Sequence, residues 1–294
     1  MLRIERILCP VDFSESSARA YDSAQSLARY YDAQLFLQHV VDFDLPCYAY
    51  YADAVHIVDF LGSIHADAQS QLEDFAQMHA SGDVRAECHV QEGAVTGSIL
   101  SFAAEQRVHL IVMGAHGLKA ADRATLGGVA EKVLRKARGP VLVSRKPARP
   151  QAGPYDAQGS IQLRRVLFCT DFSEPARQAL TYALSVAEEY DAEITLLHVL
   201  EDVRSLASVQ EAIARANSQI NKLISPDRAK AVRIKTMVRI GRAYEQIIQY
   251  AAEVQADLVI MAVRGRNALD LAVFGSTTYR VIQLGPCSVL AVRV

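Results

Sequence analysis

Glycine and hydroxyl residues recur with the same spacing in two places in this 294-residue chain. The first is Met113-Gly114-Ala115-His116-Gly117, followed after nine residues by Gly127-Gly128. The second is Met261-Ala262-Val263-Arg264-Gly265, followed after nine residues by Gly275-Ser276-Thr277-Thr278. A glycine turn that leads into a helix start presents backbone N–H groups to a phosphate, and the helix dipole favours the negative charge. The pattern therefore predicts two phosphate sites, and the hydroxyls of Ser276 and Thr278 are further donors in the second.

A carboxylate follows a short apolar run in two other places. Asp12 follows Arg6–Val11, and Asp171 follows Arg165–Thr170. In an α/β domain, ligands bind beyond the carboxyl ends of the parallel strands, at the switch in strand order. A carboxylate at that edge can accept hydrogen bonds from a ribose or a base, so the two patterns together favour a nucleoside phosphate.

The chain is an internal duplication. Glu5–Asp42 aligns without a gap with Arg164–Glu201 at a shift of 159, and Gly93–Arg145 aligns with Gly241–Arg293 at a shift of 148. Such long matches indicate duplication of one domain and exclude a short-period solenoid. Three of the nine prolines fall between residues 146 and 160, which is typical of a linker. We expect a first domain over residues 1–147, a linker over 148–162 and a second domain over 163–294.

Short apolar runs alternate with longer amphipathic stretches in each half. Runs such as Leu110–Met113 lack polar alternation, as expected for strands buried on both faces of a parallel sheet. Ser17–Tyr31 and Arg177–Tyr190 are predicted helices, with Ser14 and Ser173 as N-caps. The order βαβαβαβαβ predicts an α/β fold of two tandem doubly wound, Rossmann-like domains, each with a five-stranded, mainly parallel sheet. The strands are expected at 4–11, 34–41, 84–91, 108–114, 141–145, 165–170, 193–200, 232–240, 257–263 and 289–294.

Composition and missing motifs exclude several classes of function. The formal net charge of −2 argues against a nucleic-acid binder, and the apolar runs are too short to span a membrane. Five scattered cysteines without CxxC spacing argue against a disulfide framework and fit a cytoplasmic protein. The sequence has no Walker A loop, no G-x-G fingerprint and no G-x-S-x-G or H-E-x-x-H motif. We expect no catalytic triad and no metal site, and at most a slow ATPase activity.

The G-x2-G-x9-G-[S/T] pattern, the aspartate after the first strand and the pairs His39-Val40 and His198-Val199 resemble the universal stress proteins. The resemblance covers nearly the whole chain and implies the adenine nucleotide α-hydrolase-like fold of that family. It also implies an adenine nucleotide, ATP or AMP, with Mg²⁺ as a candidate companion of the triphosphate. The implied adenosine contacts are Val11, Asp12, Val40, Thr170, Asp171 and Val199. The implied phosphate contacts are Gly114, Gly117, Gly127, Gly265, Gly275, Ser276 and Thr278. Met261 is a further implied cofactor contact.

Both copies depart from the family pattern. The first keeps three glycines but has Gly128 and Ala130 where the second has Ser276 and Thr278. The second has Ala262 in place of the first glycine, which is harmful only if the loop requires a positive φ there. Because hydroxyls add phosphate contacts, the second domain is the favoured triphosphate site, and the first is expected to hold a monophosphate or nothing. Arg264 and Arg266, or His116 and Lys119 in the first copy, are candidate sources of positive charge.

Structural explanations compete with these functional ones. The glycines could serve only to shape turns, and Asp12 and Asp171 could serve only to cap the following loop. His39 and His198 are expected to be hydrogen-bonded structural histidines, since they lie at a buried strand end. Tyr48, Tyr50 and Tyr51 fall in an insertion that is a loop, with a lid or partner patch as the alternative.

The resulting expectation is a cytoplasmic stress-response protein that binds adenine nucleotide and regulates or protects through an unknown protein partner. A weak ATPase and a nucleotide-free interaction scaffold are the alternatives. The last strands, Val141–Arg145 and Val289–Val294, are candidates for pairing the two halves into an internal pseudo-dimer, with dimerisation of whole chains as a further option.

Overall fold

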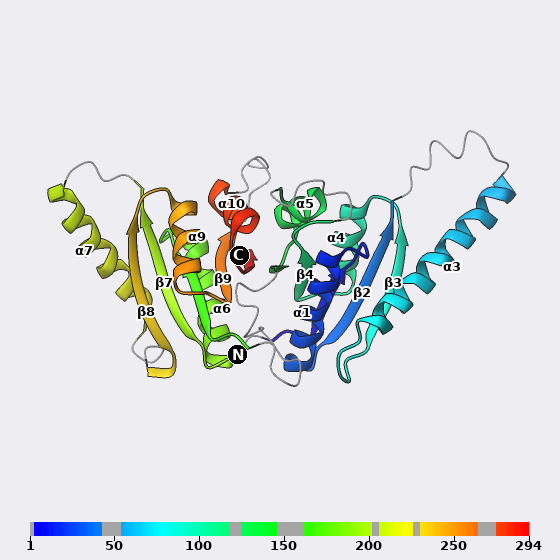
Figure 1. Ribbon diagram of the computed structural model, residues 1–294, viewed down its shortest axis with the longest axis horizontal. Helices are drawn as coiled ribbons and strands as arrows, with labels where there is room; N and C mark the ends of the chain where they lie inside the picture. The colour runs from blue at the N-terminus through cyan, green and yellow to red at the C-terminus, as the bar shows by residue number, and fades with distance from the viewer. Residues whose placement is uncertain are drawn as a thin grey trace. The chain divides into compact units, whose positions relative to one another are not determined.

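The computed structural model describes residues 3–42, 54–117, 125–145, 162–201, 206–225, 230–263 and 275–293. Strands and helices alternate along the chain, as Figure 1 shows. In the first repeat they are β1 (Arg6–Pro10), α1 (Glu15–Tyr31), β2 (Gln34–Val41), α3 (Ala54–Met78), β3 (Ala86–Glu92), α4 (Val95–Glu105), β4 (Leu110–Gly114), α5 (Gly128–Lys136) and β5 (Val141–Ser144). In the second they are β6 (Arg165–Cys169), α6 (Glu174–Glu189), β7 (Glu193–Leu200), α7 (Leu206–Leu223), β8 (Arg233–Ile240), α9 (Ala243–Glu253), β9 (Leu258–Val263), α10 (Ser276–Leu284) and β10 (Ser288–Arg293).

The described residues divide into two compact units. The N-terminal unit holds residues 4–138, and the C-terminal unit holds residue 3, residues 139–145 and residues 162–293. The predicted linker lies outside the described residues up to position 161. Strand β5 belongs to the first repeat by sequence but to the C-terminal unit by its contacts.

The N-terminal unit is built on four parallel strands in the order β3-β2-β1-β4. The chain moves outward from β1 to β3 and then returns to β4, so right-handed crossovers place α1 and α3 on one face and α4 and α5 on the other. The ring of Phe75 in α3 lies 5.9 Å from that of Tyr21 in α1, and α4 packs against α5. The switch in strand order between β1 and β4 is where this fold binds ligands.

The C-terminal unit repeats this arrangement and adds two strands, β10 and β5. Its order is β5-β10-β9-β6-β7-β8, with parallel neighbours from β10 to β8. Strand β5 runs antiparallel to β10, with Val143 opposite Val289. The predicted pairing of the two final strands is therefore confirmed, and so is the α/β class with its mainly parallel sheet.

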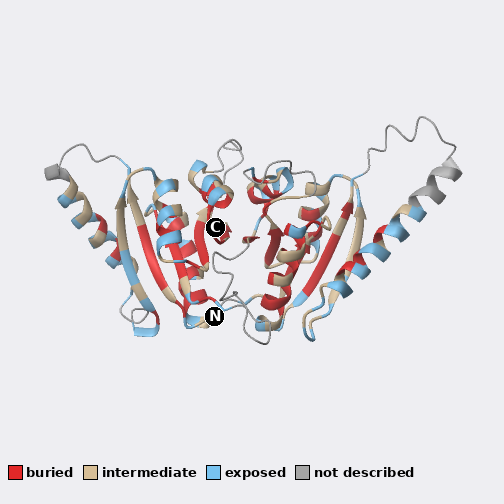
Figure 2. Ribbon diagram, in the orientation of Figure 1, coloured by how far each residue is buried: buried red, intermediate tan, exposed pale blue. Residues whose placement is uncertain are grey.

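The central strands form the core of each unit. Ile7, Leu8 and Cys9 of β1 and Leu167 and Phe168 of β6 are fully buried. Figure 2 shows the buried residues concentrated on the inner strands, with exposed positions on the outer faces of the helices. No described helix is long and apolar enough to cross a membrane.

Helix starts follow the predicted capping. Ser14 Oγ accepts a hydrogen bond from Ser17 N at 3.1 Å, and Ser173 Oγ accepts one from Ala176 N at 3.4 Å. Each cap satisfies one of the N–H groups that a helix start leaves unpaired. The caps fix the start of the first helix of each repeat two residues after the aspartate that follows the preceding strand.

Candidate functional site

The glycine segment after β4 lies directly on the carboxylate after β1. Asp12 Oδ1 accepts a hydrogen bond from Ser14 N at 3.2 Å, which orients the side chain. A Cβ atom built on Gly117 would lie only 2.5 Å from Asp12 Oδ2. No side chain fits at position 117 unless the carboxylate moves, so the structure brings these two predicted site residues together.

The other two glycines of the first copy are also needed for close approach. A Cβ on Gly114 would lie 2.5 Å from Ser16 Oγ and 2.9 Å from the Ser16 backbone, at the start of α1. A Cβ on Gly127 would lie 3.3 Å from Ala115 O, and Gly127 N donates to that oxygen at 2.9 Å. None of the three has a positive φ. The glycine spacing therefore closes a tight backbone loop, which is a more specific requirement than a flexible turn.

Helices α5 and α10 begin without side-chain caps. The N-cap residues are Gly127 and Gly275, and neither makes a side-chain capping hydrogen bond. Gly128 is exposed, and a Cβ added there would meet nothing within 4 Å. The first N–H groups of these helices carry the positive end of the helix dipole, which is suited to an anion such as phosphate.

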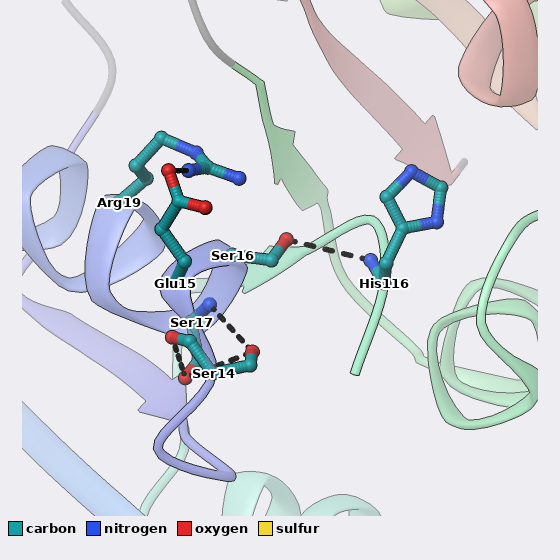
Figure 3. Close-up of polar contacts among 6 residues, drawn as sticks. All are labelled: Ser14, Glu15, Ser16, Ser17, Arg19 and His116. Atoms are coloured by element: carbon teal, nitrogen blue, oxygen red, sulfur yellow. Dashed lines mark hydrogen bonds and ion pairs between the residues drawn. The ribbon is translucent and has the colours of Figure 1, made fainter. Parts of the chain in front are cut away.

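His116 holds the glycine loop together. Its backbone N donates to Ser16 Oγ at 3.4 Å, as Figure 3 shows, and its Nδ1 contacts Thr125 O at 2.7 Å. Because a carbonyl can only accept, Nδ1 carries the proton in this contact. The imidazole therefore joins the two ends of the loop, and its Nδ1 is not directed at a phosphate. Lys119, the other candidate charge, lies outside the described residues.

Half-buried His39 and Phe13, whose backbone conformation is strained, connect the end of β2 to the turn after β1. Val11 and Val40 are buried, and His39 Nδ1 donates to Val11 O at 2.9 Å, which confirms the structural role expected for this histidine. The ring of Phe13 lies 4.4 Å from that of His39. Phe13 has a φ of 62°, in the left-handed region that side-chain-bearing residues seldom adopt.

The second repeat reproduces this geometry. His198 Nδ1 donates to Thr170 O at 2.8 Å, and the ring of Phe172, whose φ is also 62°, lies 4.3 Å from that of His198. Asp171 is exposed, and its Oδ1 accepts hydrogen bonds from the backbone N and the hydroxyl of Ser173. The two copies therefore share the same turn after their first strand.

The residues of the second repeat that were predicted to contact phosphate or to line that part of the site are described only in part. Met261 is buried in β9, and Ala262 in the same strand has no positive φ, so the methyl group replacing the first glycine is tolerated. Ser276 is exposed at the first position of α10, whereas Thr278 is buried. Val199 is half-buried at the end of β7. Gly265, Arg264 and Arg266 lie outside the described residues.

Two pairs of residues at this edge were missed from sequence. Phe13 and Phe172 have positive φ, and so do Gly93 and Gly241, which follow β3 and β8 and donate through their backbone N to Val41 O and Leu200 O. The sequence does show the same residue at the same position in both repeats, which was the signal that could have identified them. Neither pair carries a reactive group, so residue types with evident chemistry did not point to them.

The buried cysteine thiols among the described residues are not reactive groups. Burial raises the pKa of the Cys9 and Cys169 thiols well above their usual range, and it raises that of Cys287 to about 12. A buried thiol with a raised pKa is a packing residue, since the thiolate is the reactive form. No group of three or more metal-binding side chains occurs among the described residues.

Comparisons with known proteins agree with this fold. The model of the universal stress protein family matches residues 3–145 and again 162–293. A universal stress protein of Methanocaldococcus jannaschii is 31% identical over 146 residues, covering 49% of this chain and 84% of that protein. One of Mycolicibacterium smegmatis is 25% identical over 300 residues, covering 98% of this chain and 96% of its own. The crystal structure of a universal stress protein from Archaeoglobus fulgidus has a TM-score of 0.72 at 20% identity and covers 99% of both chains.

The chain therefore belongs to the universal stress protein family, as a tandem member with two copies of the domain.

Proposed function

We propose that this chain is an adenine-nucleotide-binding stress-response protein that acts through nucleotide-dependent interaction with a protein partner. The observation that carries the proposal is the contact between Gly117 and Asp12, where a Cβ would lie 2.5 Å from the carboxylate. It supports the proposal because a glycine loop, an uncapped helix start and a carboxylate able to accept hydrogen bonds from a ribose lie at one sheet edge. A chain that needed only a turn would not require three close backbone approaches at Gly114, Gly117 and Gly127.

Different residues of the site bind the base, the ribose and the phosphates of the nucleotide. Buried Val11 and Val40 supply an apolar surface for the base, and the carboxylate of Asp12 accepts hydrogen bonds from the ribose. The N–H groups at the start of α5 attract the phosphates. Thr170, Asp171, Val199 and the start of α10 have the same roles in the second repeat. Ligand binding at these loops shifts the protein toward the conformation that binds the ligand best, which is how nucleotide would control a partner interaction.

Calorimetric titration of nucleotide-stripped protein with ATP and Mg²⁺, and separately with AMP, tests the proposal. We expect saturable binding, weakened at least tenfold at one site by Asp12→Asn and at the other by Asp171→Asn. Gly117→Ala should weaken the first site because its methyl group displaces the Asp12 carboxylate. Gly128→Ala is the matched control, since its methyl group meets nothing within 4 Å. Absence of both heat and a melting-temperature shift in the wild type would contradict the proposal and favour the scaffold alternative.

A phosphate-release assay at saturating ATP separates a binder from a weak ATPase. Among the described residues, no set of nucleophile, base and orienting group recurs in both repeats, so we expect turnover at or near the background rate. Turnover that is lost in the Ser276→Ala and Asp171→Ala variants would establish the ATPase instead.

A further inference from the structure

Arg145, the residue after β5, reaches the end of a helix in the other repeat. Its backbone N donates to Ser288 Oγ at 3.1 Å. Its guanidinium donates to Gly285 O at 3.1 Å and also to Gln283 O. Gln283 lies in the last turn of α10 and Gly285 is its C-cap residue, so one side chain of the first repeat binds two terminal carbonyls of a helix in the second.

Helix α10 has no cation of its own at this end. Its last turn contains no basic residue, whereas the last turn of the corresponding helix α5 contains Arg135 and Lys136. The last carbonyls of a helix are unpaired and carry the negative end of its dipole, so they favour a nearby cation. Arg145 supplies that charge to α10.

The environment of Arg145 is suited to a fixed contact. The side chain is half-buried, and burial lowers the pKa of its guanidinium, which stays a cation because an arginine does not deprotonate in proteins. A planar guanidinium that binds two carbonyls is held in one orientation, which a flexible surface arginine is not. The C-cap is tightly packed as well: Gly285 N donates to Val281 O at 2.8 Å, and a Cβ on Gly285 would lie 2.5 Å from that oxygen.

The other end of α10 is the phosphate end of the second site. Gly275 provides no side-chain cap there, and Ser276 is the first helical residue. A helix of nine residues is about 14 Å long and moves as one body. The position of its N-terminus therefore depends on what fixes its C-terminus.

We propose that Arg145 is a positioning residue for the second nucleotide site. It fixes the C-terminus of α10 and thereby aims the N-terminal N–H groups and the Ser276 hydroxyl at the phosphates. The phosphate affinity of the second repeat then depends on a residue of the first. This inference rests on the proposed function, because it concerns the same site.

The test uses the full chain with Asp12→Asn in the background, so that binding at the second site is read alone. Arg145→Gln removes the cation, Arg145→Lys restores it without the planar fork, and Arg138→Gln is the control, since Arg138 is exposed and lies outside the C-terminal unit. We expect Arg145→Gln to weaken ATP binding roughly three- to tenfold, with partial recovery in Arg145→Lys and no change in Arg138→Gln. Adenosine, measured by competition, should bind equally to all of them because it lacks phosphates.

Two outcomes would overturn the inference. Unchanged ATP affinity in Arg145→Gln would show that α10 is positioned without the arginine. An equal loss for ATP and adenosine would show general destabilisation. Hydrogen exchange without nucleotide gives an independent measurement: Arg145→Gln should speed exchange at the hydrogen-bonded amides of α10, from Tyr279 onward, and Arg138→Gln should not. If the wild type bound no nucleotide, the proposed function would fail, and hydrogen exchange would still decide whether Arg145 fixes this helix.

Discussion

At the residue scale, the two copies of the site differ most where α5 and α10 begin. The first helical residue is Gly128 in one copy and Ser276 in the other. A Cβ at position 128 would enter open space, so this difference imposes no packing cost. The hydroxyl can therefore be transferred to the first repeat without disturbing the loop.

We expect Gly128→Ser to strengthen phosphate binding at the first site. One added neutral hydrogen bond contributes about 0.5–1.5 kcal/mol, or about a two- to tenfold gain in affinity. The measurement is ATP titration with Asp171→Asn in the background, which silences the second site. Gly128→Ala adds the Cβ without the hydroxyl and should give no such gain. Equal affinities for the serine and alanine variants would show that phosphate does not lie at this helix start.

The phenylalanine after each aspartate has an unfavourable backbone conformation that its ring helps to hold. We expect Phe13→Ala to destabilise the protein through loss of the contacts with His39 and Phe75, whose rings lie 4.4 and 5.6 Å away. Phe13→Gly loses the same contacts but relieves the strain of φ = 62°, so it should be the more stable of the two by about 1 kcal/mol. At positions with a negative φ, glycine is usually more destabilising than alanine. Urea unfolding of both variants measures the difference in their free energies of unfolding. A glycine variant less stable than the alanine variant would contradict the claim that the backbone at position 13 is strained.

Residue types with evident chemistry were predictable, and residues that only shape the backbone were not. Gly117 and Gly127 were identified from their spacing, Asp12 from its position after the first strand and all three from the family resemblance, and the structure places them together. The left-handed turn at Phe13 and the joining role of His116 depend on contacts between residues distant in sequence. Such contacts leave no periodic pattern, so composition and spacing did not indicate them.

At the scale of elements, strand limits were predicted closely where consecutive apolar residues are buried, as in β2 and β7. Strands β2 and β7 have the predicted limits, Gln34–Val41 and Glu193–Leu200. Helix α1 begins at Glu15, two residues before the predicted Ser17, because its first turn is defined by capping at Ser14 and not by apolar periodicity. The start of this helix is therefore set by one polar capping contact, which the spacing of apolar residues does not indicate.

The cap of α1 is expected to matter for stability and for the site. Ser14→Ala removes the hydrogen bond from Ser17 N and should lower the free energy of unfolding by about 1 kcal/mol. The substitution leaves the bond between Ser14 N and Asp12 intact, so nucleotide affinity should fall less than in Asp12→Asn. Ser101→Ala is the control, because Ser101 is an exposed mid-helix residue whose hydroxyl bonds back to Gly97 O. A Ser14→Ala protein as stable as Ser101→Ala would rule out the cap as a stabilising contact.

At the scale of the whole molecule, sequence order and structural grouping disagree at β5. The duplication predicts five strands for each half, and the alternation of elements confirms the order along the chain. Contacts group β5 with the C-terminal unit, where it pairs with β10. The sequence indicated that these two strands could pair, but an apolar run such as Val141–Ser144 does not reveal which unit it stabilises.

A substitution in the first repeat should therefore destabilise the second. Val143 of β5 and Val112 of β4 are both fully buried valines, so their alanine variants lose the same two methyl groups, each change costing about 2 kcal/mol. We expect Val143→Ala to reduce hydrogen-exchange protection in β9 and β10 and to leave β1 and β2 protected, because β5 packs in the C-terminal unit. Val112→Ala should do the reverse. If Val143→Ala weakened β1 and β2 as much as β10, the two units would unfold as one, and the strand pairing would stabilise the whole chain instead of one half.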